Sequence, residues 1–141
     1  MTKPDATILL ADDDEATRRT LRRWLMQLSV PVHILEAENG EQALAAVTTH
    51  CQATARPCSL LVLLDLNMPV MDGFEFLERK AQLPQAYQQA MTVVVVSSTP
   101  SEEEKARAQA LATEIKPKPL DVHQLLALIH NYLPEATVNK E

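Results

Sequence analysis

The sequence has few of the features that mark several common classes of protein. Only 4% of its 141 residues are aromatic, so the core has to be built from Leu, Val, Ile and Ala. No apolar run approaches the ~20 residues that a membrane-spanning helix needs. Residues 1–5 carry no apolar signal region. We therefore expect a cytosolic protein that folds as one domain over residues 1–141.

Clustered positive charge and metal-like cysteine spacings are also missing. The formal net charge is −6 and no patch of Lys and Arg stands out, so nucleic acid is not expected as the direct partner. Cys51 and Cys58 lie outside any Cys-x-x-Cys pattern, and the four histidines are scattered. We predict reduced thiols rather than a disulfide, and no histidine-based metal site.

What the sequence does contain is a regular alternation of short apolar runs and helical patterns. The apolar runs predict five strands, at Thr7–Ala11, Val32–Ala37, Ser59–Leu64, Thr92–Val96 and Thr113–Ile115. The third run is continuous, as expected for a strand covered on both faces. The fourth contains four consecutive valines, whose branching at Cβ suits a strand.

Segments with helical spacing separate these runs. Their predicted inward-facing residues are Thr17, Leu21, Trp24, Leu25 and Leu28; Ala43, Leu44 and Val47; Phe74, Leu77 and Ala81; and Val122, Leu125, Leu126, Ile129 and Leu133. A charged helix is predicted at 102–111 and a short extra one at 85–90. Five strands alternating with five helices predict an α/β fold, a doubly wound parallel sheet. Its core spans about 7–133, and 134–141 is expected to be a flexible tail.

Polar side chains follow four of the predicted strands. The first strand is followed by Asp12–Asp14, the third by Asp65, the fourth by Ser97 and Ser98, and the fifth by Lys118. In doubly wound folds the active crevice lies beyond the carboxyl ends of the strands. We therefore expect these groups to converge from distant parts of the sequence.

Clustered carboxylates repel one another unless a cation or a proton joins them. Mg²⁺ prefers oxygen ligands, and Asp13 and Asp65 can each supply one, Asp12 can hold a metal-bound water, and the Asn67 carbonyl can complete the set. A carboxylate beside Mg²⁺ can attack a phosphoryl group. Lys118 could then pair with a phosphoryl oxygen, and the Ser97 hydroxyl could donate a hydrogen bond to another. The residue types predict an aspartyl phosphate site.

Each residue also has a plainer interpretation. Residues 12–15 could merely cap the first helix, Asp65 could be an ordinary loop acid, and Lys118 a solvated lysine. Ser97 could only cap the following turn. The joint occurrence of all four groups at strand ends favours a phosphoryl site.

Three segments, "ILLADDDEATRRTL", "LVLLDLNMPVMDGFEFL" and "KPL" at 118–120, resemble the receiver domain of two-component response regulators. The resemblance covers about 7–133 and implies the strand order 2-1-3-4-5. It also implies that Asp65 is the phosphoacceptor and that Asp12 and Asp13 form the acidic pair. The Asn67 carbonyl is then a metal ligand, and the bond between Lys118 and Pro119 is expected to be cis. Ser97 matches the switch hydroxyl.

The chain departs from the family pattern at three places. Ile115 occupies a position that is usually aromatic, which puts the usual output coupling in question. Leu111 replaces a common glycine. Ser98 follows Ser97, and a slip of one residue would exchange their roles, although we favour Ser97.

The resemblance implies a single-domain response regulator rather than an enzyme, with catalysis limited to its own phosphoryl group. A histidine kinase or a histidine phosphotransfer protein would supply the phosphoryl group. A protein target would then be contacted through helix 102–111, strand 113–115 and the last helix. One alternative is a receiver-like module that binds partners without phosphorylation. Another is a haloacid-dehalogenase-like phosphatase, but Asn67 stands where that family places its acid.

Overall fold

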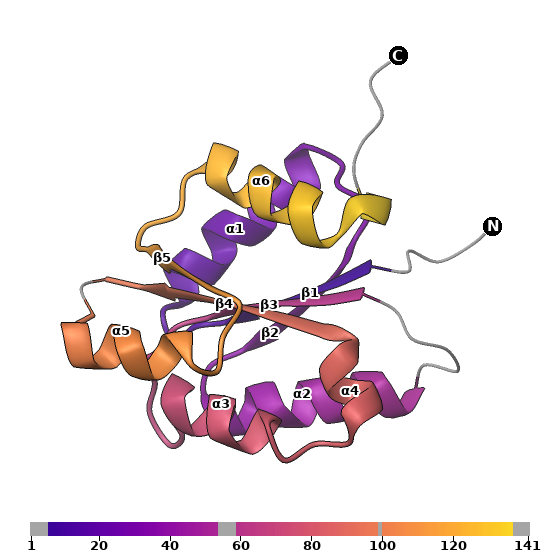
Figure 1. Ribbon diagram of the computed structural model, residues 1–141. Coiled ribbons are helices and arrows are strands. Elements are labelled where there is room, and N and C mark those ends of the chain that lie inside the picture. Colours follow the sequence, from indigo (N-terminus) through magenta and orange to yellow (C-terminus); the bar gives the residue numbers. More distant parts are fainter. Residues whose placement is uncertain (1–5, 54–58, 99, 137–141) are drawn as a thin grey trace.

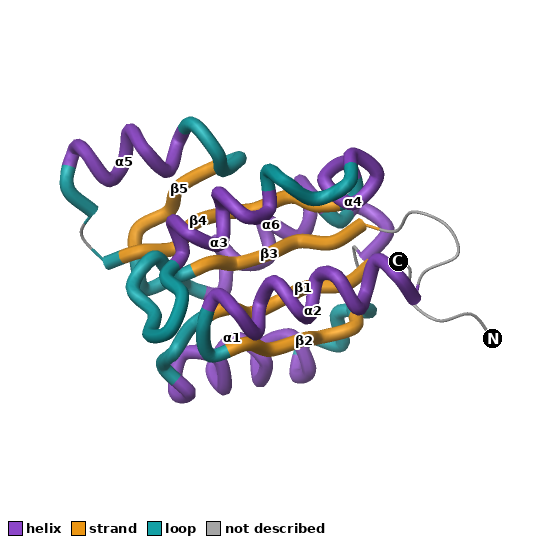
Figure 2. Tube along the Cα trace, turned by 90° about the horizontal axis from the view of Figure 1, so that it is seen from below, coloured by secondary structure: helices purple, strands orange, loops and turns teal. Residues whose placement is uncertain are grey.

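A five-stranded sheet, parallel throughout, forms the centre of the molecule. The computed structural model describes residues 6–53, 59–98 and 100–136. The strands run in the order β2-β1-β3-β4-β5, which confirms the predicted fold (Figures 1 and 2). Their bounds are Ala6–Ala11 for β1, His33–Ala37 for β2, Ser59–Leu64 for β3, Met91–Ser97 for β4 and Glu114–Pro117 for β5.

Six α-helices and one short 3₁₀ helix lie among the described residues. Their bounds are Glu15–Gln27 for α1, Gly40–Ala53 for α2, Gly73–Lys80 for α3, Gln85–Gln89 for α4, Glu102–Gln109 for α5, Val122–Tyr132 for α6 and Pro134–Ala136 for η1. The five main helices of the prediction correspond to α1, α2, α3, α5 and α6. The short extra stretch is α4, so the sheet has six α-helices around it instead of five.

The two faces of the sheet carry separate hydrophobic cores. Helices α1 and α6 cover one face, and α2, α3 and α5 pack against the other (Figure 1). Leu61 and Leu63 of β3 face the α1 and α6 side, while Leu60, Val62 and Leu64 face the opposite side. This alternation explains why the β3 sequence is apolar without a break, because both of its faces are buried.

Some predicted core positions differ in the structure. Leu28 is 43% exposed, because α1 ends at Gln27 and the Leu28 N–H bonds back to Trp24 and Met26 as the helix closes. Ala81 is also exposed, since it follows the end of α3. Two buried apolar residues were missing from the predicted stripes, Phe76 and Leu128.

The last strand and the tail begin later than predicted. β5 starts at Glu114, although the N–H of Thr113 already donates to the Val93 carbonyl of the neighbouring strand β4. Residues 134–136 of the predicted tail form η1, and Ala136 is 1% exposed against the α6 core. Residues 137–141 and Cys58 lie outside the described residues. No helix in the described ranges is long and apolar enough to cross a membrane.

Candidate metal and phosphoryl site

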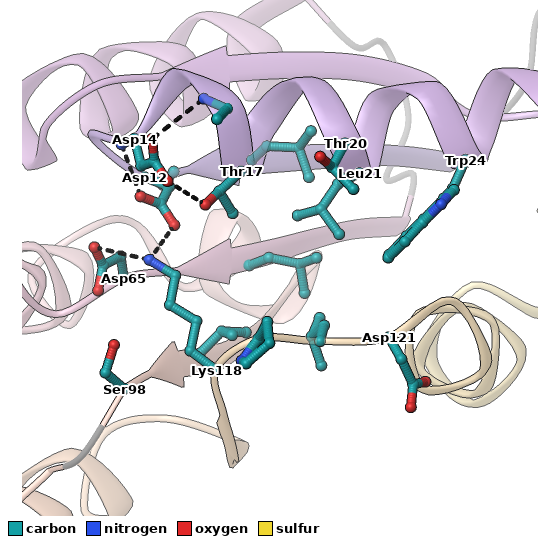
Figure 3. A pocket seen from close by; sticks show the side chains of 17 residues that line it. Asp12, Asp14, Thr17, Thr20, Leu21, Trp24, Asp65, Ser98, Lys118 and Asp121 are labelled. Carbon is teal, nitrogen blue, oxygen red and sulfur yellow. Dashed lines mark hydrogen bonds and ion pairs between the residues drawn. The ribbon is translucent and has the colours of Figure 1, made fainter.

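The predicted groups meet at the carboxyl edge of the sheet. Asp12, Asp65, Ser98 and Lys118 line one cavity of about 630 Å³ (Figure 3). They come from the ends of β1, β3 and β4 and from the segment after β5. Because parallel strands end at the same edge, segments far apart in the sequence contribute to one site. The cavity continues between α1 and the segment that leads into α6, where Leu21, Trp24 and Leu120 line it.

Three carboxylates form the acidic part of this site. One oxygen from each of Asp12, Asp13 and Asp65 lies within 4.8 Å of the others. Asp12 and Asp65 are 7% and 6% exposed, whereas Asp13 is exposed. Burial raises the pKa of Asp65, and the charge of Asp12 raises it further, although Lys118 opposes both effects. The site therefore places two buried carboxylates beside an exposed one.

Lys118 is the cation that the structure places among these acids. Its Nζ lies 2.7 Å from Oδ2 of Asp12 and 3.5 Å from Oδ2 of Asp65. Burial alone would lower the pKa of Lys118, but hydrogen bonds and charges from the two acids outweigh burial and raise it. The peptide bond between Lys118 and Pro119 is cis, as the resemblance implied. The Lys118 main-chain N–H donates to the Ser97 carbonyl at 2.9 Å, which ties the segment after β5 to the end of β4.

The acidic residues that follow β1 make different contacts. Asp14 caps α1: its carboxylate accepts from the Ala16 N–H at 3.2 Å and from the Thr17 hydroxyl at 2.6 Å. The Thr17 hydrogen bond lowers the pKa of Asp14. Asp12 instead points toward Lys118 (Figure 3). The plainer capping interpretation therefore applies to Asp14, which leaves Asp12 for the site.

The loop that follows Asp65 is held by close backbone contacts. The Asn67 N–H donates to Oδ1 of Asp65 at 3.3 Å, and the Gly40 N–H donates to the Met71 carbonyl at 2.7 Å. A Cβ on Gly40 would lie 2.6 Å from that carbonyl, and one on Gly73 would lie 2.6 Å from the Asp65 carbonyl. The sequence contains only two glycines, and both allow this loop to pack closely. The scarcity of glycine is the sequence feature that could have indicated these close contacts.

Ser98, and not Ser97, lines the cavity. Ser97 is 2% exposed and does not line the cavity, whereas the exposed Ser98 does, with its side chain labelled in Figure 3. Strand geometry explains this difference. Val94 and Val96 face the same core as Leu63, so alternation puts Ser98, and not Ser97, on the face that Asp65 also occupies. Ser98, the alternative to Ser97, therefore lines the cavity, and which of the two serines donates to a phosphoryl oxygen stays a prediction.

The acids suit a hard divalent cation. Carboxylate oxygens are preferred ligands of Mg²⁺, and the repulsion that raises the pKa of Asp65 is relieved when a cation binds between the acids. Asn67 is exposed next to them. Its role as a carbonyl ligand stays a prediction.

The protein is an α/β domain whose all-parallel sheet carries two buried aspartates and a lysine at its carboxyl edge. The family model described as the response regulator receiver domain matches residues 8–130. The chain therefore belongs to the response regulator receiver family.

Individual relatives agree with this assignment. The chain is 30% identical to the "Autoinducer 1 sensor kinase/phosphatase LuxN" of Vibrio campbellii over 94% of its own length, but this covers only 14% of LuxN. It is 31% identical to an uncharacterized 14.6 kDa protein of Leptolyngbya boryana, over 89% of this chain and 88% of that protein. The solved structure of the Vibrio cholerae chemotaxis protein CheY4 is similar with a TM-score of 0.70 at 27% identity, covering 90% of this chain and 98% of that one.

Proposed function

We propose that this domain is a phosphoacceptor switch in which Asp65 takes a phosphoryl group from the phosphohistidine of a kinase or phosphotransfer protein. The observation that carries the proposal is the placement of Asp65. Its carboxylate is buried beside two further acids and within 3.5 Å of a lysine ammonium, at the edge of the sheet where the cavity opens. Membership of the receiver family supports the same role.

The transfer needs few covalent changes. A carboxylate oxygen of Asp65 forms a bond to phosphorus while the bond from phosphorus to the imidazole nitrogen breaks, and the nitrogen keeps the electron pair. Asp12, Asp13, Asp65 and the Asn67 carbonyl would hold Mg²⁺, which when bound would neutralise charge on the phosphoryl oxygens. Lys118 exchanges a carboxylate partner for a phosphoryl oxygen. The Ser98 hydroxyl donates to another oxygen.

Ser98 also suggests how the signal leaves the site. A second cavity of about 480 Å³ lies between α5 and β5 and is lined by Ser98, Pro100, Lys105, Gln109, Ile115, Lys116 and Pro117. Ser98 is common to both cavities. Movement of this residue toward a phosphoryl group changes the surface of α5, β5 and α6, where we place the contact with a downstream protein.

The proposal is tested by intact mass after incubation with acetyl phosphate and Mg²⁺. We expect the wild type to gain the mass of one phosphoryl group, and neither Asp65→Asn nor wild type in a chelator to do so. Asp72→Asn is the matched control and should be labelled, because Asp72 caps α3 and does not belong to the group of Asp12, Asp13 and Asp65, the acidic trio. A folded wild type that takes no label would contradict the proposal. Rapid multiple turnover of small phosphomonoesters, lost in Asp65→Asn, would point instead to a phosphatase.

A further inference from the structure

Arg18 is a buried charged residue with no part in the proposed phosphoryl transfer. It lies on α1, and its side chain is only 10% exposed. Its Nη1 donates to the Asp12 carbonyl oxygen at 2.6 Å, and its Nε donates to Oε1 of Glu36 at 3.0 Å. One guanidinium thus joins the first helix, the end of β1 and the neighbouring strand β2.

The Asp12 carbonyl is one of several atoms of this residue that are held in place. The main-chain N–H of Asp12 donates to the Ala37 carbonyl at 3.0 Å. Its Oδ1 accepts from the Asp14 N–H at 2.9 Å, and its Oδ2 accepts from Lys118 at 2.7 Å. Arg18 therefore completes the set of contacts that fixes the direction in which the Asp12 carboxylate points.

Arg18 is itself restrained from its other side. Glu36 accepts from Arg18 through one carboxylate oxygen and from Arg22 through the other. The planar guanidinium presents its N–H groups in a fixed fork, so a bond at each end sets its orientation. A carboxylate held by two arginines leaves the Arg18 head group little freedom to turn away from Asp12.

Stability alone is a poor explanation for such an arrangement. The pair of Arg18 with Glu36 is only partly buried, since the Glu36 side chain is 31% exposed, and partly exposed ion pairs add little to the stability of a fold. What an arginine offers over an apolar residue at this position is a set of hydrogen bonds of defined direction, which hold a particular atom in place. The atom that is held here belongs to a residue of the acidic trio.

We propose that Arg18 is a positioning residue for the cation site, acting through the Asp12 main chain and anchored by Glu36. This inference rests on the proposed function in taking Asp12, Asp13 and Asp65 as the Mg²⁺ ligands. Residues that orient metal ligands typically change metal affinity by about 10–100-fold when they are removed. Arg18→Met keeps the length of the side chain and removes its hydrogen bonds, so we expect Mg²⁺ to bind at least about 10-fold more weakly.

The test is a calorimetric titration with MgCl₂ alone, combined with thermal unfolding. Leu25→Ala is the matched control, because Leu25 is a buried residue of the same helix on the α1–α6 core. It should lower Tm and leave the Mg²⁺ dissociation constant unchanged, whereas Arg18→Met should raise that constant. Glu36→Gln can still accept from Arg18 and should have a smaller effect than Arg18→Met.

The outcomes separate the two proposals. If Arg18→Met lowers Tm but binds Mg²⁺ as the wild type does, Arg18 is structural only and the inference is overturned. If the wild type binds no Mg²⁺, the proposed function fails together with it. Should Arg18→Met not fold, Arg18→Lys retains the charge but cannot make the same forked contacts, and an unchanged dissociation constant in that variant would equally overturn the inference.

Discussion

The ammonium group of Lys118 lies 2.7 Å from the Asp12 carboxylate, closer than its 3.5 Å distance from Asp65 (Figure 3). The lysine therefore acts as an internal counter-ion for the acids. It contacts the same carboxylates beside which a metal cation and a phosphoryl group would bind. Its release from these acids and the binding of those groups should be linked.

Replacing Lys118 should separate metal binding from phosphoryl transfer. In Lys118→Met the acids lose their counter-ion, so added Mg²⁺ should raise Tm more than it does in the wild type. Labelling by acetyl phosphate should slow by about 10²–10³-fold, as when one donor to a developing charge is removed. Thermal unfolding with and without Mg²⁺, and timed intact-mass measurements, check the two effects. Lys116→Met, which breaks a pair with Glu114 beside the second cavity, should change neither.

Asp65→Asn should stabilise the protein at neutral pH when no metal is present. Burial and the charge of Asp12 raise the pKa of Asp65, so the folded state binds this proton more tightly than the unfolded state does. Ionisation of Asp65 therefore destabilises the folded protein. This destabilisation is absent below the unfolded pKa near 3.8 and is complete once the pH exceeds the pKa of Asp65 in the folded state. Tm of the variant should therefore exceed that of the wild type at pH 7, by about 3–5 °C for each kcal/mol relieved.

The pH dependence provides the control for this prediction. The difference in Tm between Asp65→Asn and the wild type should shrink as the pH falls from the raised folded pKa of Asp65 toward 3.8, and should be small below 3.8. Mg²⁺ should restore stability to the wild type more than to the variant, because the variant offers one carboxylate fewer. A variant less stable than the wild type at pH 7 would show that the pairing of Asp65 with Lys118 outweighs its burial.

The two adjacent serines should have separable effects. Ser98→Ala should still accept a phosphoryl group, but its α5 and β5 backbone should change little on labelling, because the hydroxyl that links the two cavities is gone. Hydrogen–deuterium exchange before and after acetyl phosphate and Mg²⁺ measures this response. Ser97→Ala should respond as the wild type does. The reverse pattern would return the role to Ser97, as the sequence had suggested.

The overall fold could be predicted from local patterns in the sequence. The bounds of β3 were predicted to the residue, because a continuous apolar run between polar segments has one reasonable interpretation in an α/β chain. The meeting of Asp12, Asp65 and Lys118 followed from topology alone, since parallel strands end at one edge.

Features that depend on tertiary packing were harder to predict. The choice between Ser97 and Ser98 depends on which face of β4 lies over the Asp65 side, and the four valines before them give no alternation to read. The contact between Gly40 and Met71 joins segments that are distant in sequence. The burial of Arg18 could not be seen either, because an arginine beside other arginines on a helix looks exposed.

Val70 carries a local strain that a substitution can measure. Its φ is 68°, a left-handed conformation that costs a residue with a Cβ about 1–2 kcal/mol, and the residue is 76% exposed. Asparagine tolerates this conformation, so Val70→Asn should raise the free energy of unfolding by about 1 kcal/mol in denaturant titration.

Val70→Thr is the matched control, since threonine is polar yet branched at Cβ in the same way as valine. It should leave the free energy of unfolding near the wild-type value, which separates the backbone conformation from the exposure of an apolar side chain. Equal stabilisation by both substitutions would mean that apolar exposure, and not φ, is the unfavourable feature. The loop around Val70 is held from both sides by the Gly40 and Gly73 main-chain bonds, so its conformation should persist in each variant. A gain confined to asparagine would therefore show that the packing of the Asp65 loop imposes the strain.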